Sequence, residues 1–311
     1  MANRVAELLG VEIPIIQAPM GYIARAQLAS AVSDAGAMGI IETSSGELDE
    51  IRGEIAKMRD LTDRPFGVNI AQLLVRDPGI VDFVADQGVR FVTTSAGDPA
   101  EHTATLKAAG ITVFHVVPSL RGALKAVEAG VDGLVVEGIE GGGFKNPYGA
   151  SSMVLLPLIA AHVEVPIVAA GGVCDATSMA AAFVLGAEGA QMGTRMLSAA
   201  ESPVHDNYKA AIVGARETET LLVNRSHRPA MRVLRSDRSL ALEADDAPAT
   251  EAMGRIRDLY FGGDMATSIA FAGQVTGRID DVRPVAEILR ETWEGCRSAL
   301  DAGAGRLGGG R

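Results

Sequence analysis

The sequence contains little cysteine and no long apolar run. Cys174 and Cys296 are the only cysteines in 311 residues, too few and too isolated for a disulfide framework or a metal site. No apolar stretch reaches the length that spans a bilayer, and the acidic Glu7 lies where a secretory signal would be apolar. These absences predict a soluble, cytoplasmic protein without a bound metal.

Positive charge is also scarce. Lysine and arginine number 28 against 39 aspartates and glutamates, which gives a net charge of −11. Because this charge repels nucleic acid and anionic membranes, we expect neither as a partner. The hydrophobic fraction of 48% is enough for a large core in one domain with an elaboration.

A dinucleotide fingerprint is missing as well, because Gln17-Ala18-Pro19-Met20-Gly21 contains one glycine where GxGxxG would follow a first strand. Instead, apolar runs alternate with stretches of helical spacing. The eight runs are Pro14–Pro19, Met38–Glu42, Phe66–Ile70, Phe91–Ser95, Thr112–Val117, Gly133–Glu137, Pro166–Gly171 and Gly189–Gly193. Such nearly all-apolar runs are typical of parallel strands buried on both faces. The glycines that follow the helical stretches are Gly36, Gly88, Gly110, Gly130 and Gly186.

Repeated strand–helix units predict an α/β protein with right-handed crossovers. Eight units without an antiparallel signal favour a closed (β/α)8 TIM barrel over an open doubly wound sheet. We assign the barrel to residues 1–202 and a small, mostly helical inserted cap to the more charged residues 203–263. Residues 264–300 are expected to form a helical segment that packs back on the barrel, and residues 301–311 a disordered, glycine-rich tail.

Two strand ends predict a phosphate site. The seventh and eighth runs end in Gly171-Gly172 and in Gly193-Thr194. Strands that end in glycine and lead into a helix present free backbone N–H groups and a helix dipole, and the last two barrel strands commonly share one phosphate. The triple glycine Gly141-Gly142-Gly143 lets a flat or anionic ligand approach the backbone. We therefore expect a monophosphate cofactor rather than a dinucleotide.

As a set, these segments resemble the motifs of one flavoprotein superfamily. The matching segments are Pro14–Met20, Pro65–Asn69, Val116–Ser119, Glu140–Gly143, Ala169–Gly172, Gln191–Arg195, Ser202–His205 and Ala272–Gln274. The superfamily contains nitronate monooxygenases (formerly 2-nitropropane dioxygenases), NADH:quinone reductases and flavin-dependent enoyl-acyl carrier protein reductases II. The resemblance runs from about residue 5 to about residue 295, and it implies an FMN-bound TIM barrel with a small helical cap.

The resemblance also implies which residues hold FMN. Those expected along the flavin ring are Ala18, Pro19, Met20, Gly21, Asn69, Gly142 and Gly143. Those expected at the ribityl chain and the phosphate are Gln191, Met192, Gly171, Gly172, Gly193 and Thr194. Without the surrounding motifs, Asn69 would be an ordinary strand-end residue and Met20 a core residue.

The sequence departs from the family after the triple glycine. Nitronate monooxygenases and the enoyl reductases carry a histidine beside the flavin, and this chain has Phe144, whose ring cannot exchange a proton. Lys145, Tyr148 and His205 are the candidate catalytic groups in its place, although a loop lysine is commonly solvated or bound to phosphate. His115, inside the fifth run, is expected to be a buried core residue.

Phe144 and the segment Val116–Ser119 favour a reductase. We expect an FMN-dependent oxidoreductase that takes hydride from NAD(P)H and reduces a quinone or an activated C=C bond of an enoyl thioester. Oxidation of alkyl nitronates with oxygen is an alternative, because a nitronate is already deprotonated. A non-flavin barrel for a phosphorylated ligand, such as a sugar phosphate isomerase, is another; Glu137 and Glu140 are its only support.

The expected partner is a small-molecule substrate, and a coenzyme A or acyl-carrier thioester is one possibility. Its phosphate would meet the basic group Arg225, Arg228, Arg232 and Arg235, which as an alternative forms a solvated face. The apolar C-terminal helical region makes a homodimer a reasonable expectation.

Overall fold

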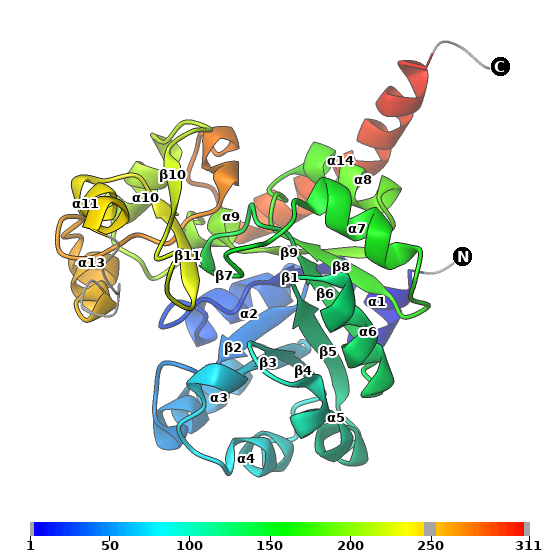
Figure 1. Ribbon diagram of the computed structural model, residues 1–311. Coiled ribbons are helices and arrows are strands. Elements are labelled where there is room, and N and C mark those ends of the chain that lie inside the picture. The colour runs from blue at the N-terminus through cyan, green and yellow to red at the C-terminus, as the bar shows by residue number, and fades with distance from the viewer. Residues whose placement is uncertain (1–2, 246–252, 308–311) are drawn as a thin grey trace.

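The computed structural model describes residues 3–245 and 253–307, and at its centre is a barrel of eight parallel strands (Figure 1). The strands are β1 (Ile15–Gln17), β2 (Gly39–Glu42), β3 (Phe66–Ala71), β4 (Phe91–Ser95), β5 (Thr112–Val117), β6 (Gly133–Glu137), β8 (Ile167–Ala170) and β9 (Gly189–Met192). In the order β1-β9-β8-β6-β5-β4-β3-β2, each strand lies beside its neighbours in sequence. Backbone bonds of 2.9 Å between Met38 and both Ile15 and Gln17 join β1 to the β2 side. The predicted TIM barrel is therefore confirmed.

Helices cover the outside of the barrel. They are α2 (Ala26–Asp34), α3 (Leu48–Leu61), α4 (Ile80–Asp86), α5 (Pro99–Ala108), α6 (Leu120–Glu128), α7 (Ser152–Ala160) and α8 (Ala176–Val184). The five glycines predicted to end helices all have positive φ, between 65° and 102°. Since side chains with a Cβ atom rarely adopt this conformation, glycine fixes where each helix stops and the next strand begins.

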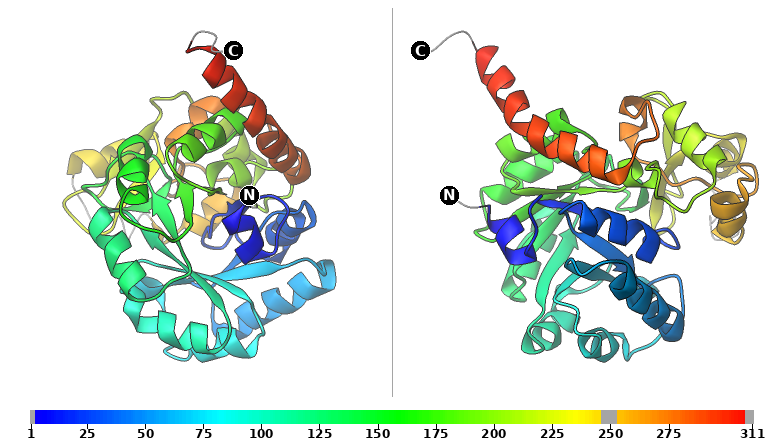
Figure 2. Two further views of the ribbon diagram at one scale, coloured as in Figure 1. Left: turned by 90° about the vertical axis from the view of Figure 1, so that its right-hand side faces the viewer. Right: turned by 180° about the vertical axis from the view of Figure 1, so that it is seen from behind.

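The barrel wall separates two apolar cores. Inside the barrel, Phe91 and Phe114 pack edge to face with ring centroids 5.3 Å apart, and Ile16 and Met38 belong to the same cluster. Val5 and Leu9 of α1 (Arg4–Leu9) pack against this cluster at the amino-terminal end, and Figure 2 shows α1 at the end opposite the cap. A second core lies between the strands and the surrounding helices. The carboxyl ends of the strands, opposite α1, are the end at which barrels of this kind bind their ligands.

The cap adjoins those carboxyl ends (Figure 1). Its described elements are α10 (Asp206–Val213), β10 (Thr220–Val223), β11 (Ala230–Leu234), α11 (Asp237–Asp245) and α13 (Ile256–Gly262). β10 and β11 form an antiparallel hairpin that pairs with β7 (Gly143–Lys145), the end of the triple-glycine loop. The sequence had indicated a mostly helical cap and no strands. The short strand β7 gives no periodic signal and forms only because a distant hairpin lies beside it.

The segment between the cap and the C-terminus differs from the predicted continuous helix. Residues 264–284 contain the short 3₁₀ helix η2 (Gln274–Arg278), and α14 (Val285–Gly305) begins only after Pro284. α14 packs on α8 and α2, and its end projects from the body (Figure 2). It continues past residue 300, where a disordered tail was expected, and residues 308–311 of that tail lie outside the described chain. Among the described residues no helix is long and apolar enough to cross a membrane.

Candidate active site

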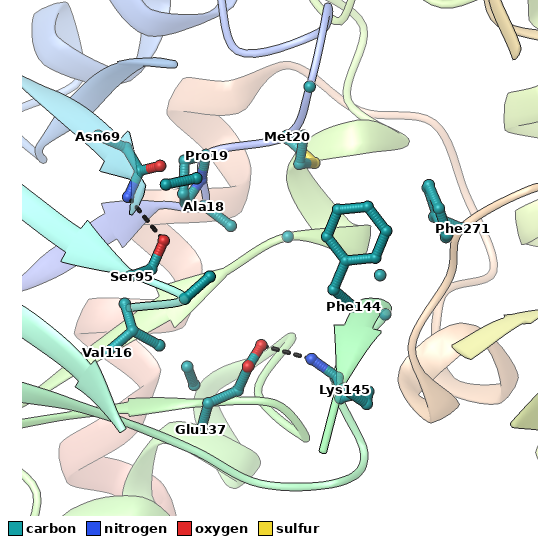
Figure 3. A pocket seen from close by; sticks show the side chains of 18 of the residues that line it. Ala18, Pro19, Met20, Asn69, Ser95, Val116, Glu137, Phe144, Lys145 and Phe271 are labelled. Atoms are coloured by element: carbon teal, nitrogen blue, oxygen red, sulfur yellow. Dashed lines mark hydrogen bonds and ion pairs between the residues drawn. The ribbon is translucent and has the colours of Figure 1, made fainter. Parts of the chain in front are cut away.

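A cavity of about 740 Å³ lies at the carboxyl ends of the strands and is lined by both barrel and cap (Figure 3). Its size is typical of a cofactor or ligand site. The predicted site residues that line it are Ala18, Pro19, Met20, Gly21, Asn69, Gly142, Gly143, Lys145, Gly171, Gly172, Gln191, Gly193 and Thr194. Residues far apart in the sequence thus meet at one place.

Asn69 shows how the barrel orients a polar side chain toward this cavity. Its Nδ2 donates to the carbonyl of Thr93, at 3.1 Å, and to the Thr93 hydroxyl, at 2.9 Å, on the neighbouring strand β4. The side-chain oxygen lies on the side of Pro19 (Figure 3). Asn69 is 2% exposed, so its amide is fixed rather than solvated. A ring lying beside Pro19 would therefore meet a hydrogen-bond acceptor at this point.

The triple-glycine loop lies directly against residues 270–274. A Cβ atom on Gly142 would lie 2.7 Å from the carbonyl carbon of Ala272, and one on Gly273 would lie 2.9 Å from the carbonyl oxygen of Glu140. The N–H of Gln274 donates to that same oxygen at 2.9 Å. Glycine is therefore required at both positions, because no side chain fits between the two backbones.

The ends of β8 and β9 are the place where the sequence predicts a phosphate cup. Gly171 and Gly172 both have positive φ, of 81° and 82°, and Gly193 precedes α9 (Thr194–Leu197). Within residues 3–245 and 253–307, no protein acceptor faces the backbone N–H groups of Gly172, Gly193 or Thr194. The Thr194 hydroxyl accepts the N–H of Gly273, at 2.9 Å, which joins the cup to the segment beside the cap. Free backbone N–H groups that converge at neighbouring strand ends suit an anion.

Gln191 provides independent evidence that the cavity suits a polar ligand. It is 7% exposed, and its Oε1 is buried without a hydrogen-bond partner among the described residues. A buried carbonyl oxygen without a donor is costly, so a ligand hydroxyl would be stabilised there. Met192 was predicted beside the same ligand, but it is fully buried in the outer core instead. Adjacent strand residues point to opposite faces, so only one of the two can line the cavity.

Two of the three predicted catalytic side chains lie elsewhere. Tyr148 is 85% exposed and does not line the cavity. His205 is an exposed N-cap of α10, where its Nδ1 accepts the N–H of Asn207 at 3.1 Å. Spacing along the loop and the start of the cap had suggested that both reach the flavin side. The three-residue strand β7 ends before Tyr148, and helix capping occupies His205.

Lys145 is the predicted catalytic residue that the cavity contains. Its Nζ lies 2.5 Å from Oε1 of Glu137, the last residue of β6, and Glu137 also lines the cavity (Figure 3). The Lys145 side chain is 3% exposed and that of Glu137 is 27% exposed. The prediction of a solvated loop lysine is therefore excluded. The sequence did not reveal this pair, because β7 has to form before Lys145 faces β6.

Phe144 forms an apolar wall with Phe271. The two rings pack edge to face with centroids 5.7 Å apart, and Met20 lies near them (Figure 3). The cap sheet holds both, since Phe144 pairs with Met231 of β11 and Phe271 bridges to Val233. Sequence reasoning missed Phe271, although the adjacent Ala272–Gln274 segment belongs to the family motifs. This part of the cavity offers no group that exchanges protons.

His115 lies on another side of the cavity and is a buried, hydrogen-bonded residue, as predicted. It is 4% exposed, and its Nδ1 lies 2.7 Å from the Thr94 hydroxyl. Burial lowers the pKa of His115 from 6.5 to about 4, although Asp98 favours the charged form. The imidazole is therefore neutral near pH 7.

The four arginines of the cap do not form one basic patch. Arg232 is buried, where its Nε donates to the Ile139 carbonyl at 2.9 Å and its Nη1 to the Thr220 hydroxyl at 3.1 Å. Arg225, Arg228 and Arg235 are exposed. Arg232 therefore joins the cap hairpin to the β6 loop, and it is not available to a phosphate at the surface.

Known proteins resemble this chain in sequence and in fold. The nitronate monooxygenase family model matches residues 2–76 and 72–295. A (3aS,4S,5R,7aS)-5-hydroxy-7a-methyl-1-oxo-octahydro-1H-indene-4-carboxyl-CoA dehydrogenase of Rhodococcus jostii is 35% identical over 78% of this chain and 68% of its own. A nitronate monooxygenase of Pseudomonas aeruginosa is 31% identical over 71% of this chain and 76% of its own. The structure of FabK from Thermotoga maritima has a TM-score of 0.93 and 33% identity, with 98% of this chain and 99% of that chain covered.

Proposed function

Because the chain belongs to the nitronate monooxygenase family of oxidoreductases, we propose that it is an FMN-dependent reductase. It takes reducing equivalents from NAD(P)H and delivers them to the activated C=C bond of an enoyl thioester, with quinones as a second class of acceptor. The observation that carries this proposal is Phe144, held by Phe271 in the cavity where the family histidine is expected. The sugar phosphate isomerase alternative is set aside, since the family consists of oxidoreductases.

The residues present fit FMN. The N–H groups of Gly172, Gly193 and Thr194 would bind its phosphate, and the unpaired Oε1 of Gln191 would accept from a ribityl hydroxyl. Ala18 to Gly21 and the open face of Gly143 would lie along the ring, with Asn69 as a hydrogen-bond partner. When bound, FMN would supply hydride transfer between nicotinamide and acceptor. The protein contributes orientation and a largely apolar enclosure.

An acyl thioester is the acceptor that best suits the enclosure. The dehydrogenase of Rhodococcus jostii named above acts, by its name, on a carboxyl-CoA substrate. In this chain, Phe144, Phe271 and Met253 give the cap side of the cavity an apolar wall for a hydrocarbon body. With FMN bound, the reaction requires one further group from the protein. This group is a proton donor for the α-carbon of the reduced thioester.

Anaerobic stopped-flow with the FMN-loaded protein tests this function. NADH and NADPH are mixed separately with the holoenzyme while flavin absorbance is followed, and crotonyl-CoA or menadione is then added. We expect one nicotinamide to bleach the flavin and both acceptors to restore its colour. If neither nicotinamide bleaches the flavin, the reductase function is overturned.

Nitronate oxidation is the second candidate, and the 31% identity to the Pseudomonas aeruginosa nitronate monooxygenase favours it. Propyl-2-nitronate arrives without the proton that a base would remove, so Phe144 does not forbid its oxidation. Oxygen uptake by the holoenzyme with propyl-2-nitronate separates the two functions. Uptake above the buffer rate together with no bleaching by nicotinamides would favour the monooxygenase.

A further inference from the structure

We propose that Lys145, held in place by Glu137, donates the proton that the α-carbon of the reduced thioester requires. The pair thus takes over the role for which the family uses histidine. This inference rests on the proposed function, because it concerns the second half of that reaction. Lys145 is the catalytic residue in this assignment, and Glu137 is a positioning residue.

Strand β7 directs the side chains of two neighbouring residues to different parts of the cavity. Phe144 points to the aromatic wall, and Lys145 points to the end of β6 (Figure 3). This alternation follows from the period of two along a strand. The substitution that removes the family histidine thus leaves a proton-bearing group one residue further along, at the same cavity.

The burial of the Lys145 side chain indicates a role beyond stability. A surface lysine ion pair gains little stability, and a buried one pays for desolvation, so burial at a cavity is not explained by stability alone. Lys145 is 3% exposed, and Glu137 is open enough, at 27%, to face a ligand. The 2.5 Å contact fixes Nζ at the wall. A proton held there is screened from bulk water until an acceptor enters.

Two other ionisable groups at the cavity, Glu140 and His115, are committed to other contacts. Both carboxylate oxygens of Glu140 accept the N–H of Ser152, at 2.8 and 3.1 Å, at the start of α7. His115 is neutral beside Thr94. These commitments leave the Glu137–Lys145 pair as the better source of a proton.

NAD(P)H supplies two electrons and one hydrogen, which add as hydride to the β-carbon of the enoyl thioester and leave an enolate. One N–H bond of the Lys145 ammonium breaks while a C–H bond forms at the α-carbon. The resulting amine, beside the Glu137 carboxylate, takes a proton from water after the saturated product leaves.

Half-reaction kinetics of Lys145→Met test the proposal. We expect bleaching by the active nicotinamide and reoxidation by menadione to remain within about threefold of wild type. Reoxidation by crotonyl-CoA is expected to slow about 10²- to 10⁴-fold, the usual contribution of general acid catalysis. Lys107→Met is the matched control, because Lys107 forms a 2.7 Å ion pair with Asp132 outside the cavity and should leave both half-reactions unchanged.

Three further readouts separate proton donation from a structural role. Ethylammonium added to Lys145→Ala, whose truncated side chain leaves room for the amine, should restore part of the crotonyl-CoA rate. In D₂O the Lys145→Met variant should lose stereospecific deuteration at the α-carbon. Glu137→Gln keeps an acceptor for Nζ without its charge, and we expect it to displace the pH profile of the crotonyl-CoA step while menadione reoxidation stays unchanged.

The outcomes are distinguishable. A wild-type crotonyl-CoA rate in Lys145→Met overturns the inference and leaves the reductase intact. Equal losses with crotonyl-CoA and menadione, without rescue by ethylammonium, show a structural role and also overturn it. A wild-type holoenzyme that reduces menadione but no enoyl thioester removes the proposed substrate and the inference together.

Discussion

At the scale of single residues, Phe144 limits the proton chemistry available in its part of the cavity. Its ring faces Phe271 and Met20 and can neither take nor give a proton (Figure 3). We expect Phe144→His to raise oxygen uptake with neutral 2-nitropropane at least tenfold, because an imidazole there can act as a base toward the nitroalkane carbon. Phe144→Leu is the matched control and should not gain this activity. An equal rise in both variants would show that space, not basicity, limits the reaction.

His115 gives a second test at this scale, through stability. Burial lowers its pKa from 6.5 to about 4, so between these values the unfolded chain binds a proton that the folded chain refuses. Stability therefore rises with pH across this window, by up to about 3 kcal/mol, and is flat above it. In His115→Asn, whose amide still reaches Thr94, this part of the rise should disappear. Urea unfolding midpoints from pH 4.5 to 7.5 measure it, with the exposed His205→Asn as control; an unchanged slope contradicts the assignment.

At the scale of elements, the β7 loop and residues 270–274 act as one unit. Gly142→Ala would place a methyl group 2.7 Å from the Ala272 backbone, and one backbone would have to move. Overpacking of this kind costs about 1–3 kcal/mol. We expect lower stability and weaker FMN binding together, because the same segment reaches Thr194 of the phosphate cup.

Thermal unfolding and fluorescence titration with FMN measure both effects. Gly53→Ala is the control, since a Cβ on Gly53 in α3 meets nothing within 4 Å and alanine is the better helix former. A Gly142→Ala protein with unchanged FMN affinity would show that the loop and the phosphate cup are independent.

At the scale of the whole molecule, one ligand would connect all eight barrel strands and the cap. The residues that line the cavity lie at the ends of β1, β2, β3, β4, β5, β6, β8 and β9 and also come from the cap, so FMN should stabilise the entire fold. At a hundredfold excess over its dissociation constant, the gain is about 2.7 kcal/mol. Riboflavin, which has the same ring without the phosphate, should raise the melting temperature far less. Equal shifts with FMN and riboflavin would contradict a phosphate site at Gly172 and Gly193.

The sequence by itself determined the barrel, because buried parallel strands are apolar throughout and glycine marks the end of each helix. It also predicted where a phosphate cup would lie, since the glycines Gly171, Gly172 and Gly193 leave their backbones accessible. These signals are local, so neighbouring residues suffice to reveal them.

Tertiary structure alone decided which side chains face the cavity. Tyr148 and His205 resembled catalytic groups by position, yet one points to solvent and the other caps α10. Lys145 meets Glu137 only because the hairpin β10–β11 turns the end of the triple-glycine loop into a strand. Pairing between distant segments sets the direction of a side chain, and no local pattern in the chain records that pairing.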